Sequence, residues 1–275
     1  KYSRFIENND LAFVNSHLDK WLDLDYDFFD LIQFGVEMNK KTFGYFDLCV
    51  KNILEGLGYD KNYSFNTSLS FLRRQESMSK ESVILDSSLS QSYLNIELNQ
   101  ENRKVKIHSE IELGGLGKGY ILDKLAEILK DFDNIFINGG GDIYVKGKDE
   151  HGKMQKVFFE NPLKSDEVLG EVEADDLFLA SSSGNKRNWG KYHHLIDPFQ
   201  RNSANDMLAT FVQAKSGILA DSYSTAFFVM GYQRAKEFLQ KDSIECEAMI
   251  IGIDGKIWRS KGFRGELYVN VNSTP

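Results

Sequence analysis

Hydrophobic residues in the first sixty positions recur at the spacing of an α-helix. Helices are predicted over a segment carrying Leu11, Val14 and Leu18, from Tyr26 to about Lys41, and from Leu48 to Leu57. Asn8 or Asn9 can cap the first helix, and Gly58 can end the third. The polar, Ser-rich stretch from Tyr63 to Lys80 predicts a surface loop.

From about Ser82 the pattern changes to the alternation that is typical of β-strands. Further strands are predicted from Tyr93 to Leu98, Lys104 to His108, Asn134 to Val145, Val157 to Glu160, Gly170 to Glu173, Leu177 to Ser182, Ala209 to Ala214, Ala248 to Ile253 and Lys256 to Ser260. Two helices are predicted from about Leu219 to Met230 and from Gln233 to Leu239. Because helices cluster early and strands later, the pattern favours an α+β fold over a regular βαβ series.

The segment Ile111 to Leu129, IELGGLGKGYILDKLAEIL, joins a short apolar run to a predicted helix through four glycines. One side of that helix carries Ile121, Leu122, Leu125, Ile128 and Leu129. Its first turn would present unbonded N–H groups and the positive end of the helix dipole, so a phosphate would fit there beside Lys118. The segment is neither a Walker A loop nor a GxGxxG fingerprint. Glycines that serve packing alone are an equally good interpretation.

Composition narrows the class of protein. The 275 residues carry a formal charge of −8 with 41% hydrophobic residues, which suits a globular protein and argues against nucleic acid as the main partner. With three prolines and no Pro/Gly/Ser-rich linker, a single domain is expected over residues 1–275, with a helical part at about 1–60 and a sheet-rich part at about 82–275. The sequence contains no run of 18 apolar residues, so no membrane span is predicted. Cys49 and Cys246 fit no metal-ligand spacing and are expected to be ordinary buried thiols.

Asp221 and Thr225 are four residues apart in a predicted helix, so they point to the same side. A carboxylate and a hydroxyl without His or Cys are oxygen ligands suited to Mg²⁺. The alternative is that Asp221 caps the helix and Thr225 bonds back to a main-chain carbonyl.

Three further segments carry groups that could serve a phosphate site. In YHHLIDP the adjacent His193 and His194 face opposite ways if the segment is extended, so at most one can act there as general acid or base, and a packed imidazole is the alternative. The run NGGGD, residues 138–142, would be explained by a closely approaching ligand or by a bulge. The run SSSG, residues 181–184, could hold a phosphate, but a Ser-rich turn needs no ligand.

These segments resemble, in content and in order, the motifs of the ApbE family of FAD:protein FMN transferases. ELGGLGKGYILD is similar to the family's DLGGIAKGYAVD, NGGGDI to N-x-G-G-D-I/L, and SSSG to T-S-G. HHLIDP matches H-I-I/V-D-P, and ADSYSTAFFVMG matches A-D-x-x-S/T-T-A-L/F-x-V-x-G. SRFIENNDLAFVN and GYFD resemble the family's early motifs, so the likeness extends from Ser3 to Met249. It implies a sheet-rich, T-fold-like α+β core flanked by helices.

The resemblance also implies roles for individual residues. Mg²⁺ would be held by Asp221, Thr225 and the main-chain carbonyl of Gly117, where the family has alanine. His194 would stand beside the reacting phosphate, and Asp221 would act mainly as a ligand. Cofactor-binding positions would be Phe5, near the flavin, and Glu112, Gly115, Lys118, Asp123, Gly140, Asp142 and Ser183.

The chain departs from the family pattern at several positions. Glu112 stands where the family has Asp, which leaves a longer carboxylate in that place. The family's D-P-x-T/S-G after the early helices is reduced to FDLCV, and its counterpart after the histidine becomes DPFQRNSAN, without the glycine. These changes weaken the expected flavin pocket and acceptor side more than the metal site.

The activity implied by the resemblance is Mg²⁺-dependent transfer of FMN from FAD to a Thr or Ser hydroxyl of an acceptor protein, with release of AMP. Two alternatives keep the same site: an Mg²⁺-dependent FAD pyrophosphatase that yields AMP and FMN, and a flavin-binding protein without turnover. By resemblance the acceptor is a membrane redox subunit. The residues themselves leave the compartment open, and the resemblance implies the cell envelope or its periplasmic face, although no leader is visible in this sequence. No nucleic-acid partner is expected.

Overall fold

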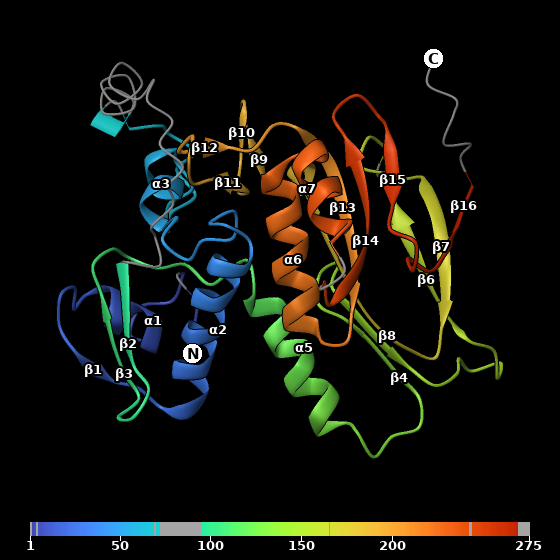
Figure 1. The fold of residues 1–275 in the computed structure, drawn as a ribbon, viewed down its shortest axis with the longest axis horizontal. Helices are drawn as coiled ribbons and strands as arrows, with labels where there is room; N and C mark the ends of the chain where they lie inside the picture. The colour runs from blue at the N-terminus through green and yellow to red at the C-terminus, as the bar shows by residue number, and fades with distance from the viewer. Residues whose placement is uncertain are drawn as a thin grey trace. The chain divides into compact units, whose positions relative to one another are not determined.

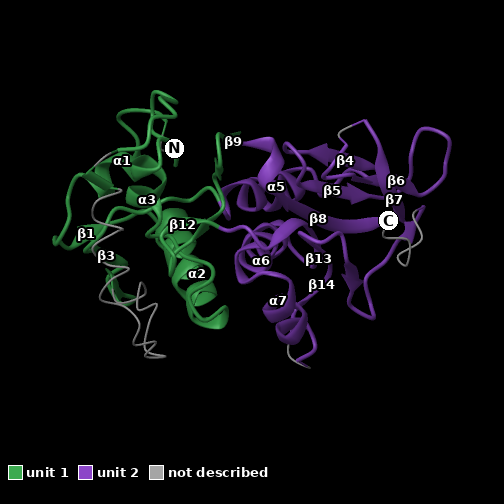
Figure 2. Cartoon of the chain, turned by 90° about the horizontal axis from the view of Figure 1, so that it is seen from above, with its two compact units in different colours: residues 1–114, 188–203 green, residues 115–187, 204–275 purple. Residues whose placement is uncertain are grey.

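The computed structural model describes residues 2–3, 5–68, 70–71, 95–164, 166–241 and 244–268. The chain divides into two compact units (Figure 2): unit 1 comprises residues 1–114 and 188–203, and unit 2 comprises residues 115–187 and 204–275. The expectation that the whole chain forms one domain stays a prediction.

Unit 2 is built on a six-stranded antiparallel sheet with the order β15-β14-β13-β8-β5-β4 (Figure 1). Its strands are β4 (Ile135–Asn138), β5 (Ile143–Lys146), β8 (Asp176–Ser183), β13 (Met207–Ala214), β14 (Cys246–Gly252) and β15 (Ile257–Arg259). β13 is buried along most of its length, as expected for a central strand that is covered on both faces. A short 3-10 helix, η2 (Gly184–Lys186), follows β8.

A three-stranded antiparallel sheet packs on one face of the six-stranded sheet. It has the order β16-β7-β6 and consists of β6 (Gln155–Glu160), β7 (Val168–Ala174) and β16 (Glu266–Leu267). Alternate residues of both sheets meet in one hydrophobic cluster, to which Phe159 contributes from β6, Phe211 from β13 and Met249 from β14. This cluster is the main core of unit 2.

Three helices lie in unit 2: α5 (Gly117–Ile128), α6 (Gly217–Met230) and α7 (Tyr232–Leu239). α6 packs against β8, β13 and β14 and also against α5 and α7, so it is buried around nearly its whole circumference (Figure 1). Residues of β13 that alternate with those in the main core face this helix, and Thr210 donates its hydroxyl to the Ser224 carbonyl at 2.8 Å. Ser224 and Ser182 of β8 share a hydroxyl hydrogen bond at 2.8 Å. These bonds fix α6 on the sheet.

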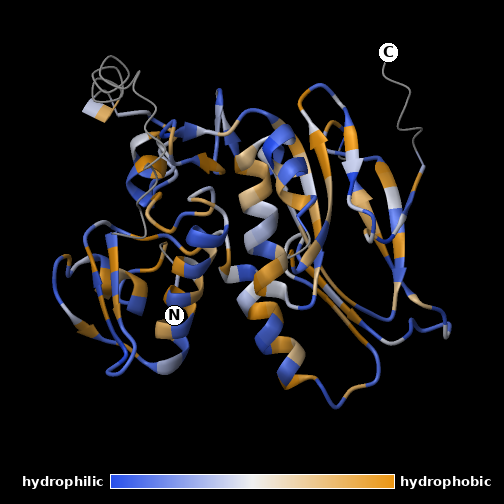
Figure 3. Cartoon of the chain, viewed as in Figure 1, coloured by the Kyte–Doolittle hydropathy of each residue, from blue (hydrophilic) through white to orange (hydrophobic). Residues whose placement is uncertain are grey.

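Unit 1 contains the early helices α1 (Asp10–Asn15), α2 (Tyr26–Lys41) and α3 (Lys51–Gly56). Hydrophobic and hydrophilic residues are distributed on different sides of α2 (Figure 3), and its inner side is buried. The Asn9 side chain caps α1 by accepting the Ala12 N–H, and Asp25 caps α2 by accepting the Phe28 N–H.

The strands of unit 1 are short. A three-stranded antiparallel sheet of order β1-β3-β2 combines β1 (Leu22–Asp23), β2 (Ile96–Asn99) and β3 (Lys104–Ile107). Residues 188–203 add two antiparallel pairs, β9 (Asn188–Trp189) with β10 (Tyr192–His193) and β11 (Ile196–Asp197) with β12 (Asn202–Ser203). Trp189 and Ile196 pack with Leu57 and Tyr59 in a hydrophobic cluster, and the Trp189 indole N–H donates to the Leu57 carbonyl at 2.8 Å.

The α+β prediction is confirmed, and most elements lie within a few residues of their predicted positions. Residues 134–145 form two strands joined by the glycines, not one broken strand. The prediction that α5 packs through a broad apolar side is wrong at both ends of that side, because Ile121 and Ile128 are 52% and 72% exposed. Only Gly119 and Leu122 of this helix are buried, so its contact stripe is narrow. The strand expected near Ser82 lies outside the described residues.

Candidate active site

The site is centred on the first turns of α5 and α6, which approach each other through two glycines. A Cβ on Gly119 would overlap the Gly217 carbonyl, and a Cβ on Gly217 would overlap the carbonyl of Gly119. A Cβ on Gly117, by contrast, would meet no atom within 4 Å. The two interpretations of the glycine turn therefore apply to different residues: Gly119 serves packing, and Gly117 borders open space.

Asp221 projects from the second turn of α6 onto the start of α5. One carboxylate oxygen accepts the Gly119 N–H at 3.0 Å, and the other pairs with the Lys118 ammonium at 2.8 Å. Asp221 does not cap its helix, because the N-cap is Ser216, whose side chain accepts the Leu219 N–H. The alternative in which Asp221 serves as a cap is thus wrong.

Asp142 supplies a second buried carboxylate from the other side of Lys118. It follows the turn between β4 and β5, where Gly140 and Gly141 have φ values of 79° and 105° that favour glycine. The Asn138 side-chain oxygen accepts both their N–H groups, at 3.1 and 2.9 Å. The Asp142 carboxylate lies 3.0 Å from the Lys118 ammonium. Three segments thus meet at one ammonium group.

The electrostatics of this cluster follow from its burial. Burial raises the pKa of Asp142, the charge of Asp221 raises it further, and Lys118 offsets only part of this, so the pKa reaches about 7. Burial alone would lower the pKa of Lys118, but the attraction of Asp221 and Asp142 outweighs burial and raises it. Lys118 therefore stays protonated beside the two carboxylates.

Asp123 was predicted as a nucleotide contact, and the structure gives its carboxylate a further role. Its two oxygens accept the N–H groups of Gly217 and Ile218 at 2.6 and 2.9 Å. Asp123 therefore bonds the first turn of α6 from the neighbouring helix. Sequence reasoning missed this role, because the partners are 94 and 95 residues away.

The serine run at the end of β8 has mainly local hydrogen bonds. The Ser183 hydroxyl accepts the Asn185 N–H at 3.3 Å and caps η2. Ser181 donates to the Gly141 carbonyl at 3.4 Å, which links this run to the turn before Asp142. Thr225, half-buried in α6, is one helical turn beyond Asp221, and Gly115 lies in the turn before α5.

Three predicted site residues belong to unit 1. The Phe5 ring stacks on Tyr63 at a centroid distance of 5.0 Å. The Glu112 carboxylate accepts the Gly114 N–H at 2.6 Å. His194 is half-buried and follows β10.

The adjacent histidine has structural partners. The N–H of His193 donates to the Ser203 hydroxyl, which donates to the His193 carbonyl, and the His193 ring accepts the Leu195 N–H.

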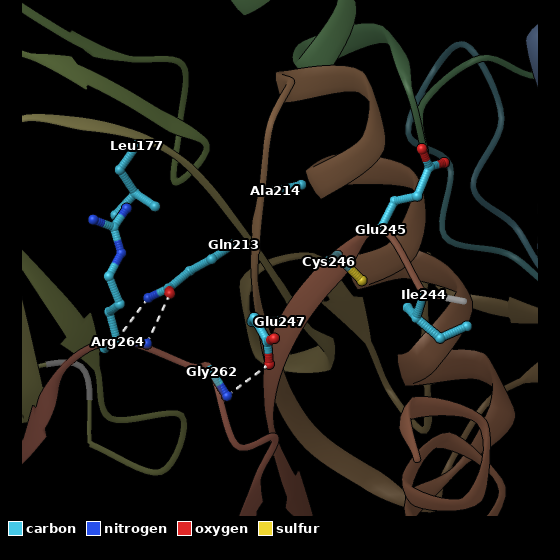
Figure 4. A pocket seen from close by; sticks show the side chains of 9 residues that line it. All are labelled: Leu177, Gln213, Ala214, Ile244, Glu245, Cys246, Glu247, Gly262 and Arg264. Atoms are coloured by element: carbon cyan, nitrogen blue, oxygen red, sulfur yellow. Dashed lines mark hydrogen bonds between the residues drawn. The ribbon is translucent and has the colours of Figure 1, made fainter. Parts of the chain in front are cut away.

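A separate surface cavity of about 320 Å³ lies in unit 2 between β13, β14 and the loop after β15 (Figure 4). Gln213 bonds the Arg264 main chain in both directions, at 2.7 and 2.9 Å, and Glu247 accepts the Gly262 N–H at 3.1 Å. None of the predicted site residues lines this cavity. Burial raises the pKa of the Cys246 thiol that lines it, and that of Cys49 in unit 1.

The described ranges hold no group of three or more His, Cys, Asp or Glu side chains placed to hold a metal ion. Nor does any helix among the residues with described positions have the length and apolarity to cross a membrane.

Comparisons with known proteins agree with the fold and the motifs. The FAD:protein FMN transferase of Haemophilus influenzae is 25% identical over 274 residues, which cover 94% of this chain and 77% of that protein. The ApbE protein of Thermotoga maritima has a crystal structure with a TM-score of 0.80 and 25% identity, covering 93% of this chain and 82% of that one. The flavin transferase ApbE of Vibrio cholerae has a TM-score of 0.78 at 19% identity, covering 94% and 83%.

The fold is therefore the α+β architecture of the flavin transferases, with a lysine and two buried aspartates at the junction of α5 and α6. The chain belongs to the ApbE family, whose model matches residues 1–250. The predicted resemblance is confirmed.

Proposed function

We propose that this protein transfers FMN from FAD to a Thr or Ser hydroxyl of an acceptor protein. The hydroxyl oxygen forms a bond to the flavin-side phosphorus, the bond from that phosphorus to the bridging oxygen breaks, and AMP leaves. Membership of the ApbE family and the names of its curated relatives support this activity. The acceptor we propose is a subunit of a membrane redox complex, and the location is the cell envelope.

The observation that carries the proposal is the contact between Asp221 and the glycine turn. The Asp221 carboxylate of α6 accepts the Gly119 N–H in the first turn of α5 at 3.0 Å and pairs with the Lys118 ammonium at 2.8 Å. Helix starts and lysines bind phosphates, and carboxylates bind the divalent cations that accompany them. A Cβ on Gly117 would meet no atom within 4 Å, so open space borders the same turn.

The residues present fit Mg²⁺. Asp142 and Asp221 are 1% exposed and share a single ammonium, so the cluster has excess negative charge and only oxygen donors. Asp221, Thr225 and the Gly117 carbonyl would hold the ion, and the Asp142 carboxylate would lie beside it. When bound, Mg²⁺ supplies charge neutralisation on the diphosphate oxygens.

The remaining chemistry belongs to the side chains and main chain. The first turn of α5 orients the diphosphate through those of its N–H groups that Asp221 does not accept. Lys118 supplies a second positive charge to the phosphate oxygens. Asp123 keeps the start of α6, and with it Asp221, in register with α5 through its two main-chain bonds. His194 accepts the proton of the attacking hydroxyl. Such a transfer depends on positioning and charge more than on covalent catalysis.

The test is incubation of the protein with FAD, Mg²⁺ and a peptide that carries the acceptor Thr or Ser. A fluorescent, covalently flavinylated peptide and an equal amount of AMP are expected. A matched peptide with Ala in place of the hydroxyl residue should stay unlabelled and release little AMP.

Two results would contradict the proposal. AMP and FMN formed at the same rate without acceptor would indicate a pyrophosphatase. Tight FAD binding without AMP in either condition would indicate a flavin-binding protein.

A further inference from the structure

Two buried carboxylates in unit 2 share one ammonium group. The side chains of Asp142 and Asp221 are 1% and 2% exposed, and Lys118 lies 3.0 and 2.8 Å from them. The Lys118 side chain itself is 35% exposed. The Lys118 side chain is therefore partly open to solvent, although its ammonium contacts a buried acidic pair.

Formal charge limits what this cluster can hold. With both carboxylates ionised, Lys118 leaves one negative charge unbalanced in a buried place, which is unfavourable. A divalent cation added to all three groups would reverse the imbalance to one positive charge. A divalent cation that takes the place of the ammonium would balance the two carboxylates fully. Replacement is thus favoured over addition.

We propose that Lys118 is a tethered cation that occupies the Asp142–Asp221 pair, and that a divalent cation binds there by displacing its ammonium group. This inference rests on the proposed function, because it concerns the metal ion of the same site. It assigns Lys118 a regulatory role: the lysine sets the affinity for the metal ion in the absence of nucleotide.

The geometry allows the displaced ammonium to move. Lysine is a compact charge on a flexible four-carbon stem, and 35% of the Lys118 side chain is exposed. The neighbouring Gly117 borders open space, since a Cβ there would meet no atom within 4 Å. A released Lys118 can then pair with the phosphates of a nucleotide, so metal ion and nucleotide should each favour binding of the other.

The first test measures Mn²⁺ binding to the full chain without FAD, by titration calorimetry. Lys118→Met keeps the length of the side chain and removes its charge. Because a positive charge about 3 Å from the carboxylates is removed, Mn²⁺ affinity should rise by about tenfold or more. The control is Lys124→Met on the same helix, whose ammonium lies over the Tyr120 ring at 5.2 Å and should leave the affinity unchanged.

Unchanged or weaker Mn²⁺ binding to Lys118→Met, with Asp221→Asn still abolishing binding, would overturn this inference and leave the proposed function intact. Binding that is equal in wild type and Asp221→Asn would instead overturn the proposed metal site itself. Adding Asp142→Asn to Lys118→Met should return the affinity toward that of wild type, since one negative charge is removed with the positive one.

The second test needs no variant. Acetylation of the wild-type protein by a limiting amount of acetic anhydride, followed by peptide mass spectrometry, should modify Lys118 several-fold faster when Mg²⁺ is present, because the ammonium has left its partners. Lys130, which pairs with the exposed Glu127, is the internal reference. Equal or slower labelling of Lys118 with Mg²⁺ would contradict displacement.

Discussion

At the scale of single residues, the site is formed by side chains that lie far apart in the sequence. Asp221 was predicted as a ligand from its helical spacing to Thr225, and the structure brings it to the glycine turn. That Lys118 also pairs with Asp142 could not be predicted, since no local pattern joins residues of different elements. The available signal for Asp142 was its position directly after three glycines in the run NGGGD.

Replacing Asp221 with Asn should reduce the rate of FMN transfer by about 100-fold or more. The substitution removes a charged metal ligand, and the metal ion it holds would lower the energy of the transition state by several kcal/mol. The amide oxygen can still accept the Gly119 N–H, so the fold should persist, as circular dichroism would check. Glu127→Gln, on the exposed side of α5, is the charge-matched control. Transfer by Asp221→Asn within tenfold of wild type would contradict the assigned role.

At the scale of elements, the close approach of α5 and α6 determines where the site residues lie. Ser216 and Asp123 together bond the first turn of α6, and Gly119 allows α5 to lie against it. The sequence predicted both helices, and the bounds of α6 to within two residues, because their hydrophobic periods are regular. It did not predict how closely the two helices approach in space, because that distance depends on main-chain contacts between residues about a hundred positions apart in the sequence.

Gly119→Ala should lower the free energy of unfolding by about 2 to 3 kcal/mol, because the added methyl group overlaps the Gly217 carbonyl and forces the helices apart. Gly117→Ala, two residues earlier, meets no atom and should leave the stability unchanged or raise it by up to about 1 kcal/mol. Urea unfolding of both variants measures the difference. Equal stability of the two would show that α5 and α6 do not rely on this contact.

His108 links elements of unit 1 in a pH-dependent manner. Its two ring nitrogens lie 2.5 and 2.8 Å from the carboxylates of Asp19, after α1, and Glu97, on β2, and Lys106 also pairs with Glu97. Hydrogen bonds to Asp19 and Glu97 raise the pKa of His108 above its usual 6.5.

A raised pKa means that the folded state binds the proton more tightly than the unfolded chain. The stabilisation is therefore complete below about pH 6.5 and is lost as pH rises through the folded pKa. The melting temperature of wild type should fall more between pH 6 and pH 9 than that of His108→Gln, on the order of a degree or more. Parallel pH profiles for the two proteins would show that this link is absent.

At the scale of the whole molecule, the order of elements indicated an α+β fold, and the motifs indicated the ApbE family. Both predictions are confirmed. The short strands β1 and β9 to β12 were missed, because pairs of two residues leave no alternation to detect. The sequence shows no Pro/Gly/Ser-rich linker where the chain passes between the two compact units, so composition alone does not mark that division.

That division affects the order in which the protein can form on the ribosome. Residues 1–114 emerge first, but Trp189 and Ile196, which complete the cluster around Leu57 and Tyr59, are made some 75 residues later. The nascent amino-terminal portion must therefore wait, with part of its apolar surface unfilled, until much of unit 2 has been synthesised. A gene fragment that stops before residue 188 would encode a chain lacking an essential part of its own interior.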